Sequence, residues 1–282
     1  MENLTRPEGS AAADFHLTRR GAAGALLAGY AVAALAADAA PVVTPVDGLI
    51  VETAVIPNGA DKALPAYVAR PAGSGRHAVV VVVNEIFGVH AYIKDICRRL
   101  AKLGYVAVAP EFFYRSGVDL AAMTDIQQII PYVKQAGDAQ VDGDVAATTR
   151  WAKAQRFAAP AKIGITGFCW GGAVTWRSAM VNPDIRAGVA WYGQLMPLVG
   201  RTGELKVPVL GLYGGKDQGI PAADVEAMRV ALAAAGKTGS DIHLYPDAGH
   251  GFHADYRASY DPAAAADGWA RMLAHFKANG VA

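Results

Sequence analysis

The sequence contains two cysteines in 282 residues, Cys97 and Cys169, so no disulfide framework is available to it. No group of Cys and His residues has the spacing of a zinc site. Neither a Gly-x-x-x-x-Gly-Lys-Ser/Thr phosphate loop nor a Gly-x-Gly-x-x-Gly dinucleotide motif follows a strand in the expected way. These absences favour an enzyme that needs neither a metal nor a cofactor.

The chain also lacks an excess of either charge. It has 26 Lys and Arg and 25 Asp and Glu, for a net charge of +1. This balance argues against a nucleic-acid surface and against a polybasic membrane patch. Hydrophobic residues make up 53% of the chain, which suits one globular domain of the larger α/β type or two small ones.

The first 40 residues differ in character from the rest. Arg19 and Arg20 stand directly before a short apolar, Ala-rich run from Ala22 to Ala37. This order is typical of a twin-arginine signal peptide, with cleavage expected before Pro41. The alternatives are an uncleaved anchor and an exposed Ala-rich helix. We expect export to the periplasm or the medium, with no stable membrane association after cleavage.

Residues 41–282 alternate between strand and helix patterns, and no internal repeat or second core is visible. A hairpin is expected from residues 49–56 and 66–70, followed by a β-branched strand at 78–83. Further strands are expected at residues 105–109, 162–166, 187–192, 207–213 and 242–245, with helices at 92–101, 144–156, 173–180, 222–235 and 262–277. The helical stretch 118–140, broken by Pro131 and Gly137, is expected to cross the active-site face. This order predicts one α/β domain, with a mostly parallel sheet and helices on both faces.

The segment Gly167–Gly172, Gly-Phe-Cys-Trp-Gly-Gly, lies between a predicted strand and a predicted helix. A glycine-flanked residue in that context is typical of a nucleophile elbow, here with Cys169 where Ser is usual. The turn places the sulfur at a helix N-terminus, where the dipole favours a thiolate. The alternative is a helix-packing turn with a small buried cysteine.

Two other residues follow later strands in the chain order of the α/β-hydrolase fold: Asp217, then His250. An imidazole can take up the thiol proton or stabilise the thiolate, and can later activate water, while an aspartate orients the ring. Taken singly, Asp217 would be a turn-capping residue and His250 a structural one. Asp247 is the rival acid on the loop of His250.

Glu85 follows the most hydrophobic strand, where this fold places its oxyanion-hole loop. The backbone N–H groups of Ile86 and Trp170 would then hold a developing oxyanion. Glu85 could tune the Cys169 thiol, or it could be a buried acid paired with an arginine that holds the loop. Phe87 and Tyr192 are candidates for the substrate pocket or for the core.

These segments together resemble the dienelactone hydrolase family: Asn84–Gly88, Phe168–Gly172, Gly215–Asp217 and Ala248–Phe252. The resemblance covers about residues 50–280 and implies an α/β-hydrolase that opens cyclic enol-lactones, without metal or cofactor. It implies Cys169 as nucleophile, His250 as base and Asp217 as its orienter, with Glu85 interacting with the resting thiol. Family members are often monomers.

The family binds the substrate carboxylate with two arginines. Arg115 matches one of them, but the other position holds His253-Ala254, and the nearest arginine is Arg257. We therefore expect Glu85 to lack its usual partner and dienelactone itself to fit less well. The sequence predicts a hydrolase of an activated ester or enol-lactone. The rivals are a general carboxylesterase with the same triad and, from another class, a non-catalytic thiol sensor or binding protein.

Overall fold

The computed structural model describes residues 42–59, 61–123 and 125–282. The predicted twin-arginine signal at residues 1–40 lies outside the described residues and stays a prediction. Within the described part, no helix combines the length and the apolar character that a membrane span requires.

The centre of the fold is strand β3 (His77–Val83), whose valines alternate between the two faces of the sheet. Val80 and Val82 pack in one apolar cluster, and Val79, Val81 and Val83 pack in another. A strand buried on both faces requires such a continuous apolar run. The run at 78–83 therefore fixes where the two hydrophobic layers meet.

The described strands form one sheet in the order β1-β2-β4-β3-β5-β6-β7-β8. The pairs β1–β2 and β2–β4 are antiparallel, and all later pairs are parallel. The remaining strands are β1 (Leu49–Ile56), β2 (Leu64–Pro71), β4 (Val106–Pro110), β5 (Ala158–Phe168), β6 (Ala187–Trp191), β7 (Val209–Gly214) and β8 (Asp241–Tyr245). The predicted α/β-hydrolase fold is confirmed.

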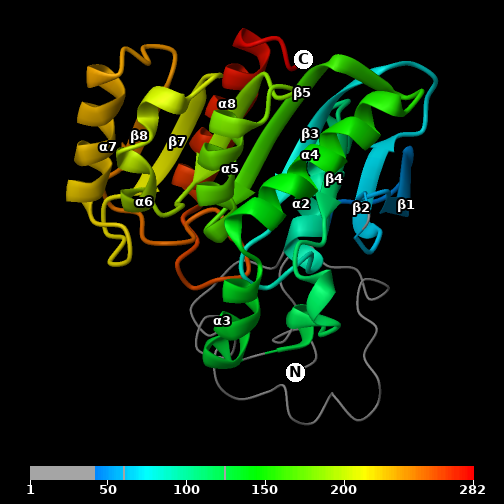
Figure 1. Ribbon diagram of the computed structural model, residues 1–282, viewed down its shortest axis with the longest axis horizontal. Coiled ribbons are helices and arrows are strands. Elements are labelled where there is room, and N and C mark those ends of the chain that lie inside the picture. Colours follow the sequence, from blue (N-terminus) through cyan, green and yellow to red (C-terminus); the bar gives the residue numbers. More distant parts are fainter. Residues whose placement is uncertain (1–41, 60, 124) are drawn as a thin grey trace.

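Helices cover both faces of the sheet (Figure 1). One face carries α2 (Ala91–Lys102) and α8 (Pro262–Ala278), whose apolar residues pack against Val80 and Val82. The opposite face carries α4 (Asp138–Ala154), α5 (Trp170–Val181) and α7 (Ala222–Ala234). Cys97 of α2 is fully buried among the first set, as expected for a core cysteine.

The structure differs from the sequence expectation mainly between residues 113 and 140. After a turn η3 (Tyr114–Ser116) and a turn η4 (Leu120–Ala122), helix α3 (Ile126–Gln135) runs through Pro131 without ending there. Helix α4 begins directly after Gly137, six residues before the expected start at 144. Two short elements also interrupt the loop 194–206: α6 (Met196–Val199) and η5 (Thr202–Glu204).

Candidate active site

Cys169 occupies the turn between β5 and α5, and its backbone is in a conformation that L-residues rarely adopt. Its φ is 55° and its ψ is −115°, and it is the N-cap residue of α5. Its N–H donates to the carbonyl of Trp191 at 3.0 Å, and its carbonyl accepts from Gly172 at 2.9 Å. A non-glycine residue held in this way is typical of functional turns. The predicted elbow geometry is therefore present in this chain.

Gly171 brings the elbow against the end of β3. A Cβ at Gly171 would lie 2.5 Å from the carbonyl oxygen of Val83 and 2.6 Å from that of Asn84. Only a residue without a side chain permits this approach. The first turn of α5 is consequently packed against the loop that carries Glu85 and Ile86.

His250 links the elbow to an aspartate. Its Nδ1 lies 2.7 Å from Asp217 Oδ2, and its side chain is near enough to that of Cys169 for the two to interact electrostatically. Asp217 is itself fixed, because its Oδ1 accepts from the backbone N–H groups of Gly219 and Ile220 at 2.8 and 3.1 Å. Burial lowers the pKa of His250, but the interactions with Asp217 and Cys169 raise it to about 10. The raised pKa favours the protonated, positively charged form of the imidazole at neutral pH.

The rival acid Asp247 points away from His250. Its side chain is 85% exposed, and it pairs with Lys216 at 2.8 Å. Asp217 is by contrast almost fully buried and contacts the imidazole directly. The structure thus brings together the three residues that the motifs predicted, in the order Cys169, Asp217, His250.

Glu85 is fully buried and has several donors around its carboxylate. Arg257 Nη2 lies 3.0 Å from Oε1, while the Tyr256 hydroxyl and His90 Nε2 lie 2.6 and 3.3 Å from Oε2. Burial raises the pKa of Glu85, but the charge of Arg257 and the hydrogen bonds with His90 and Tyr256 lower it to about 2. Glu85 is therefore a permanent anion at neutral pH.

Arg257 corrects the expectation that Glu85 lacks an arginine partner. It stands three residues beyond Ala254 along the sequence, yet its guanidinium reaches the same carboxylate. Its Cζ also lies over the rings of Phe87 and Tyr256, at 5.2 and 5.3 Å from their centroids. The pair matches the alternative stated for Glu85, a buried acid paired with an arginine, because a buried carboxylate needs a cation.

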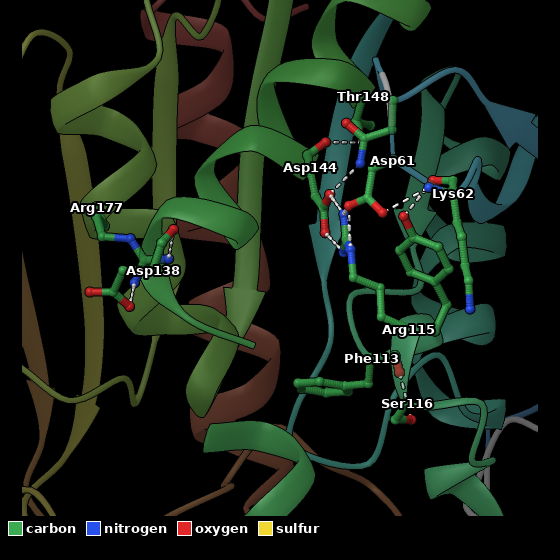
Figure 2. Close-up of polar contacts among 11 residues, drawn as sticks. Asp61, Lys62, Phe113, Arg115, Ser116, Asp138, Asp144, Thr148 and Arg177 are labelled. Atoms are coloured by element: carbon green, nitrogen blue, oxygen red, sulfur yellow. Dashed lines mark hydrogen bonds and ion pairs between the residues drawn. The ribbon is translucent and has the colours of Figure 1, made fainter. Parts of the chain in front are cut away.

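Arg115 is engaged elsewhere. Its guanidinium makes a bidentate pair with Asp144 at 2.7 Å through each nitrogen, and Nε donates to Asp61 at 2.6 Å (Figure 2). Asp144 belongs to α4, and Asp61 to the turn between β1 and β2, where Asn58 also donates to Asp144 at 2.6 Å. We call these residues, Asn58, Asp61, Arg115 and Asp144, the Arg115 clasp. The clasp ties three segments together and uses the nitrogens that the family resemblance assigned to a substrate.

The remaining predicted site residues lie around the elbow. Tyr192 follows β6 with a φ of 38°, and its ring makes an edge contact with that of His250 at a centroid distance of 5.2 Å. Phe87 and Tyr192 are both buried, so each side chain packs in the protein interior. The ring of Trp170 packs on Phe113, with centroids 4.9 Å apart.

The excursion between β4 and α4 forms a pocket beside Phe113. Its volume is about 160 Å³, and its lining includes Phe112, Arg115, Tyr132 and Gln135. Tyr132 and Gln135 belong to α3, the segment expected to shape the substrate pocket. Since Phe112 and Phe113 also contact Trp170, this pocket shares a wall with the elbow.

Comparison with known proteins identifies the family. The model of the dienelactone hydrolase family matches residues 64–280. The chain belongs to this family. Two relatives are described as "Putative carboxymethylenebutenolidase". The protein from Methylorubrum extorquens strain AM1 is 49% identical to this chain, and the one from Escherichia coli K12 is 46% identical to it. The first match covers 97% of both chains, and the second covers 89% of this chain and 96% of the relative.

The crystal structure of a Klebsiella pneumoniae protein described as a "Putative Dienelactone Hydrolase" is 45% identical, with a TM-score of 0.77. The match covers 81% of this chain and 98% of that one. The expectation of a carboxymethylenebutenolidase-like hydrolase is thereby confirmed at the level of the family. Among residues 42–59, 61–123 and 125–282, no group of three or more His, Cys, Asp or Glu side chains could hold a metal ion.

Proposed function

We propose that this chain hydrolyses an activated ester or an enol-lactone of the dienelactone type through a thioester at Cys169. The observation that carries the proposal is the geometry of the elbow. A strained Cys169 at the N-terminus of α5 lies beside His250, whose Nδ1 is 2.7 Å from Asp217 Oδ2. A nucleophile, a base and an orienting acid in this arrangement suit acyl transfer.

In the first half of the reaction, the thiolate of Cys169 attacks the acyl carbon. The carbonyl oxygen becomes an oxyanion, which the N–H groups of Ile86 and Trp170 would bind. The bond from the acyl carbon to the leaving oxygen then breaks, and the protonated His250 gives its proton to that oxygen. The products of this step are an enol or alcohol and a thioester on Cys169.

In the second half, His250 is neutral and takes a proton from water. The resulting hydroxide attacks the thioester carbon, and the bond to sulfur breaks. The carboxylic acid leaves, and Cys169 returns as a thiolate beside the imidazolium. Asp217 keeps the ring in one orientation through both halves and stabilises its positive form.

Glu85 has a different role from the one that the family resemblance implied. Its carboxylate oxygens are occupied by Arg257, Tyr256 and His90, while the side chain of Cys169 interacts with that of His250. We therefore assign thiol activation to His250. Glu85 holds Arg257, whose charge interacts with that of Cys169.

Arg257 is the cation that we assign to a substrate carboxylate. Its charge lies close enough to Cys169 for the two to interact electrostatically. Its Nη2 holds Glu85 and its Nε donates to the Tyr256 hydroxyl at 3.2 Å, so Nη1 is the nitrogen that we assign to the substrate. Arg115 is bound in its clasp. The site therefore offers one guanidinium where the family resemblance implied two.

One observation favours a second candidate function, a general carboxylesterase with the same triad. The Arg115 clasp occupies the second guanidinium. The missing cation therefore lowers the binding affinity of a neutral ester less than that of an anionic lactone. The aromatic pocket beside Trp170 also suits an uncharged acyl or alcohol group.

The proposal also covers the localisation of the protein, its partners, its oligomeric state and its cofactors. The twin-arginine pattern at Arg19 and Arg20 supports export to the periplasm or the medium. The charge balance supports a small-molecule substrate, with neither nucleic acid nor a membrane as partner. A monomer without metal or cofactor is sufficient for the chemistry described.

The test is steady-state hydrolysis of cis- and trans-dienelactone and of p-nitrophenyl acetate by the wild type, Cys169→Ala and Cys97→Ala. Cys97 is the matched control, since it is a buried cysteine of α2. We expect C169A to lose turnover of every substrate while C97A keeps it. Retained hydrolysis by C169A would overturn the mechanism. Turnover of the neutral ester alone would support the carboxylesterase.

A further inference from the structure

A second carboxylate, the partly buried Glu111, lies against the loop that carries Ile86. It follows β4, which is the parallel neighbour of β3, so the loops after both strands meet at one edge of the sheet. Glu111 Oε2 accepts from the backbone N–H of Val89 at 2.8 Å. Its own backbone N–H donates to Pro65 in β2 at 2.8 Å.

Gly88 shows how closely this carboxylate fits the loop. Its φ is +73°, and a Cβ built there would lie 3.0 Å from Glu111 Oε1 and 3.2 Å from Oε2. The positive φ turns the chain between Ile86 and Val89, and the N–H of His90 closes the turn by donating to the Gly88 carbonyl at 2.9 Å. The carboxylate of Glu111 therefore abuts the turn and is hydrogen-bonded to the residue after it.

We propose that Glu111 is the positioning residue of the oxyanion loop: through Val89 N–H it fixes the turn at Gly88 and hence the direction of the Ile86 amide. This inference rests on the proposed function of that amide. Glu111 touches neither the substrate nor Cys169 in this account. It acts only through the backbone of the loop.

The charge of Glu111 is sensitive to pH in the physiological range. Burial raises its pKa to about 7, against hydrogen bonds from the N–H groups of Val89 and Phe113. Of the charged groups in the described chain that act on it, Asp119 at η4 raises the pKa and Lys94 of α2 lowers it. The ionised carboxylate is the stronger acceptor, so the Val89 bond is strongest above pH 7.

The experiment compares the wild type with Glu111→Gln, which keeps an acceptor oxygen but cannot ionise, and with Glu111→Ala. The substrate is p-nitrophenyl acetate from pH 5.5 to 9. A parallel assay follows alkylation of Cys169 by iodoacetamide, which uses the thiolate but forms no oxyanion. C169A supplies the blank for both assays.

We expect E111Q to lower kcat/KM roughly ten-fold at pH 8, and E111A to lower it further, because a misdirected amide loses part of an oxyanion contact. The alkylation rate should stay within about two-fold of the wild type. The wild-type profile should contain an acid limb near pH 7 that E111Q lacks. Asp119→Asn should move that limb to lower pH.

Two outcomes would overturn the positioning role. One is an E111Q profile that superimposes on that of the wild type. The other is an equal loss of hydrolysis and alkylation, which would show that Glu111 acts through the nucleophile or the fold. Failure of the proposed function itself is distinguishable, because it would appear as turnover by C169A.

Discussion

One carboxylate lies in the loop after β3 and another packs against that loop, and their pKa values shift in opposite directions. Glu85, in the loop, has a guanidinium and two further hydrogen-bonding side chains as partners, and its pKa falls to about 2. Glu111, packed against the loop, has backbone N–H groups as its hydrogen-bond donors, and its pKa rises to about 7. Glu85 is the more deeply buried of the two, yet its pKa is the one that falls, so the difference lies in the partner.

This difference sets two pH windows for stability. Glu85 has a depressed pKa, so its contribution is present above its unfolded value near 4.5 and is lost as the pH falls toward 2. Glu111 has a raised pKa, so the native state holds its proton more tightly. Its contribution is present below 4.5 and is lost as the pH rises through 7. Acid weakens the first carboxylate site, and neutral pH weakens the second.

The largest effect is expected where the ion pair is broken. Glu85→Ala leaves the partly buried guanidinium of Arg257 without its carboxylate, and we expect the free energy of unfolding to fall by about 3 kcal/mol. Urea unfolding at pH 7 measures this loss. Because Glu111 accepts from the neutral backbone N–H of Val89 and not from a guanidinium, E111A should cost less. An equal cost for both variants would contradict the comparison.

The next effect concerns the substrate. The double variant Glu85→Gln/Arg257→Gln removes both charges and leaves no unpaired ion, so the fold should persist. We expect kcat/KM for a dienelactone to drop roughly 10- to 100-fold, because charge-assisted hydrogen bonds to the carboxylate are lost. Hydrolysis of p-nitrophenyl acetate should change much less. A similar drop for both substrates would show that Arg257 does not bind the substrate carboxylate.

Replacing Glu111 with Gln should stabilise the protein in one pH range only. At pH 8 the wild type bears the cost of a partly buried anion, and E111Q should be more stable by about 1–3 kcal/mol. At pH 4.5 the wild-type carboxyl is already protonated in the native state, so the two should unfold alike. Thermal unfolding of both proteins at these two pH values checks the sign. A stability difference of equal size at pH 8 and pH 4.5 would contradict this pH dependence.

The triad and the sheet were predictable because their signals are local. Cys169, Asp217 and His250 each follow a strand pattern, and their chain order matches the fold. The valines of β3 show a strand buried on both faces. No contact of distant residues had to be known for either inference.

The pairing of Arg257 with Glu85 was left open, and Glu111 was missed, because only tertiary structure brings each of them to its partner. The loop from His250 to Arg257 folds back so that Arg257 reaches Glu85, although it lies outside the family's expected position. Glu111 follows Pro110 at a strand end and resembles an exposed turn acid. The one available clue was that β3 and β4 end at the same edge, which brings Glu111 to Gly88.

The smallest effect on catalysis is expected at Arg115. Arg115→Gln should lower the free energy of unfolding by about 2 kcal/mol, because Asp144 is fully buried and loses a bidentate partner. Its kcat/KM for dienelactone should stay within about three-fold of the wild type, in contrast to the Arg257 variants. A loss as large as that caused by removing Arg257 would place Arg115 at the substrate instead of in the clasp.

The most direct test of the central claim is to trap the acyl-enzyme. The wild type is mixed with excess p-nitrophenyl acetate, quenched in acid during turnover, and mapped by peptide mass spectrometry. The account predicts one acetyl group on the peptide that contains Cys169, labile to hydroxylamine, and none on the same peptide of C169A. Steady turnover with no acetyl group at Cys169, or turnover by C169A, would contradict it. An unacetylated Cys169 in a protein without turnover would point to the thiol sensor instead.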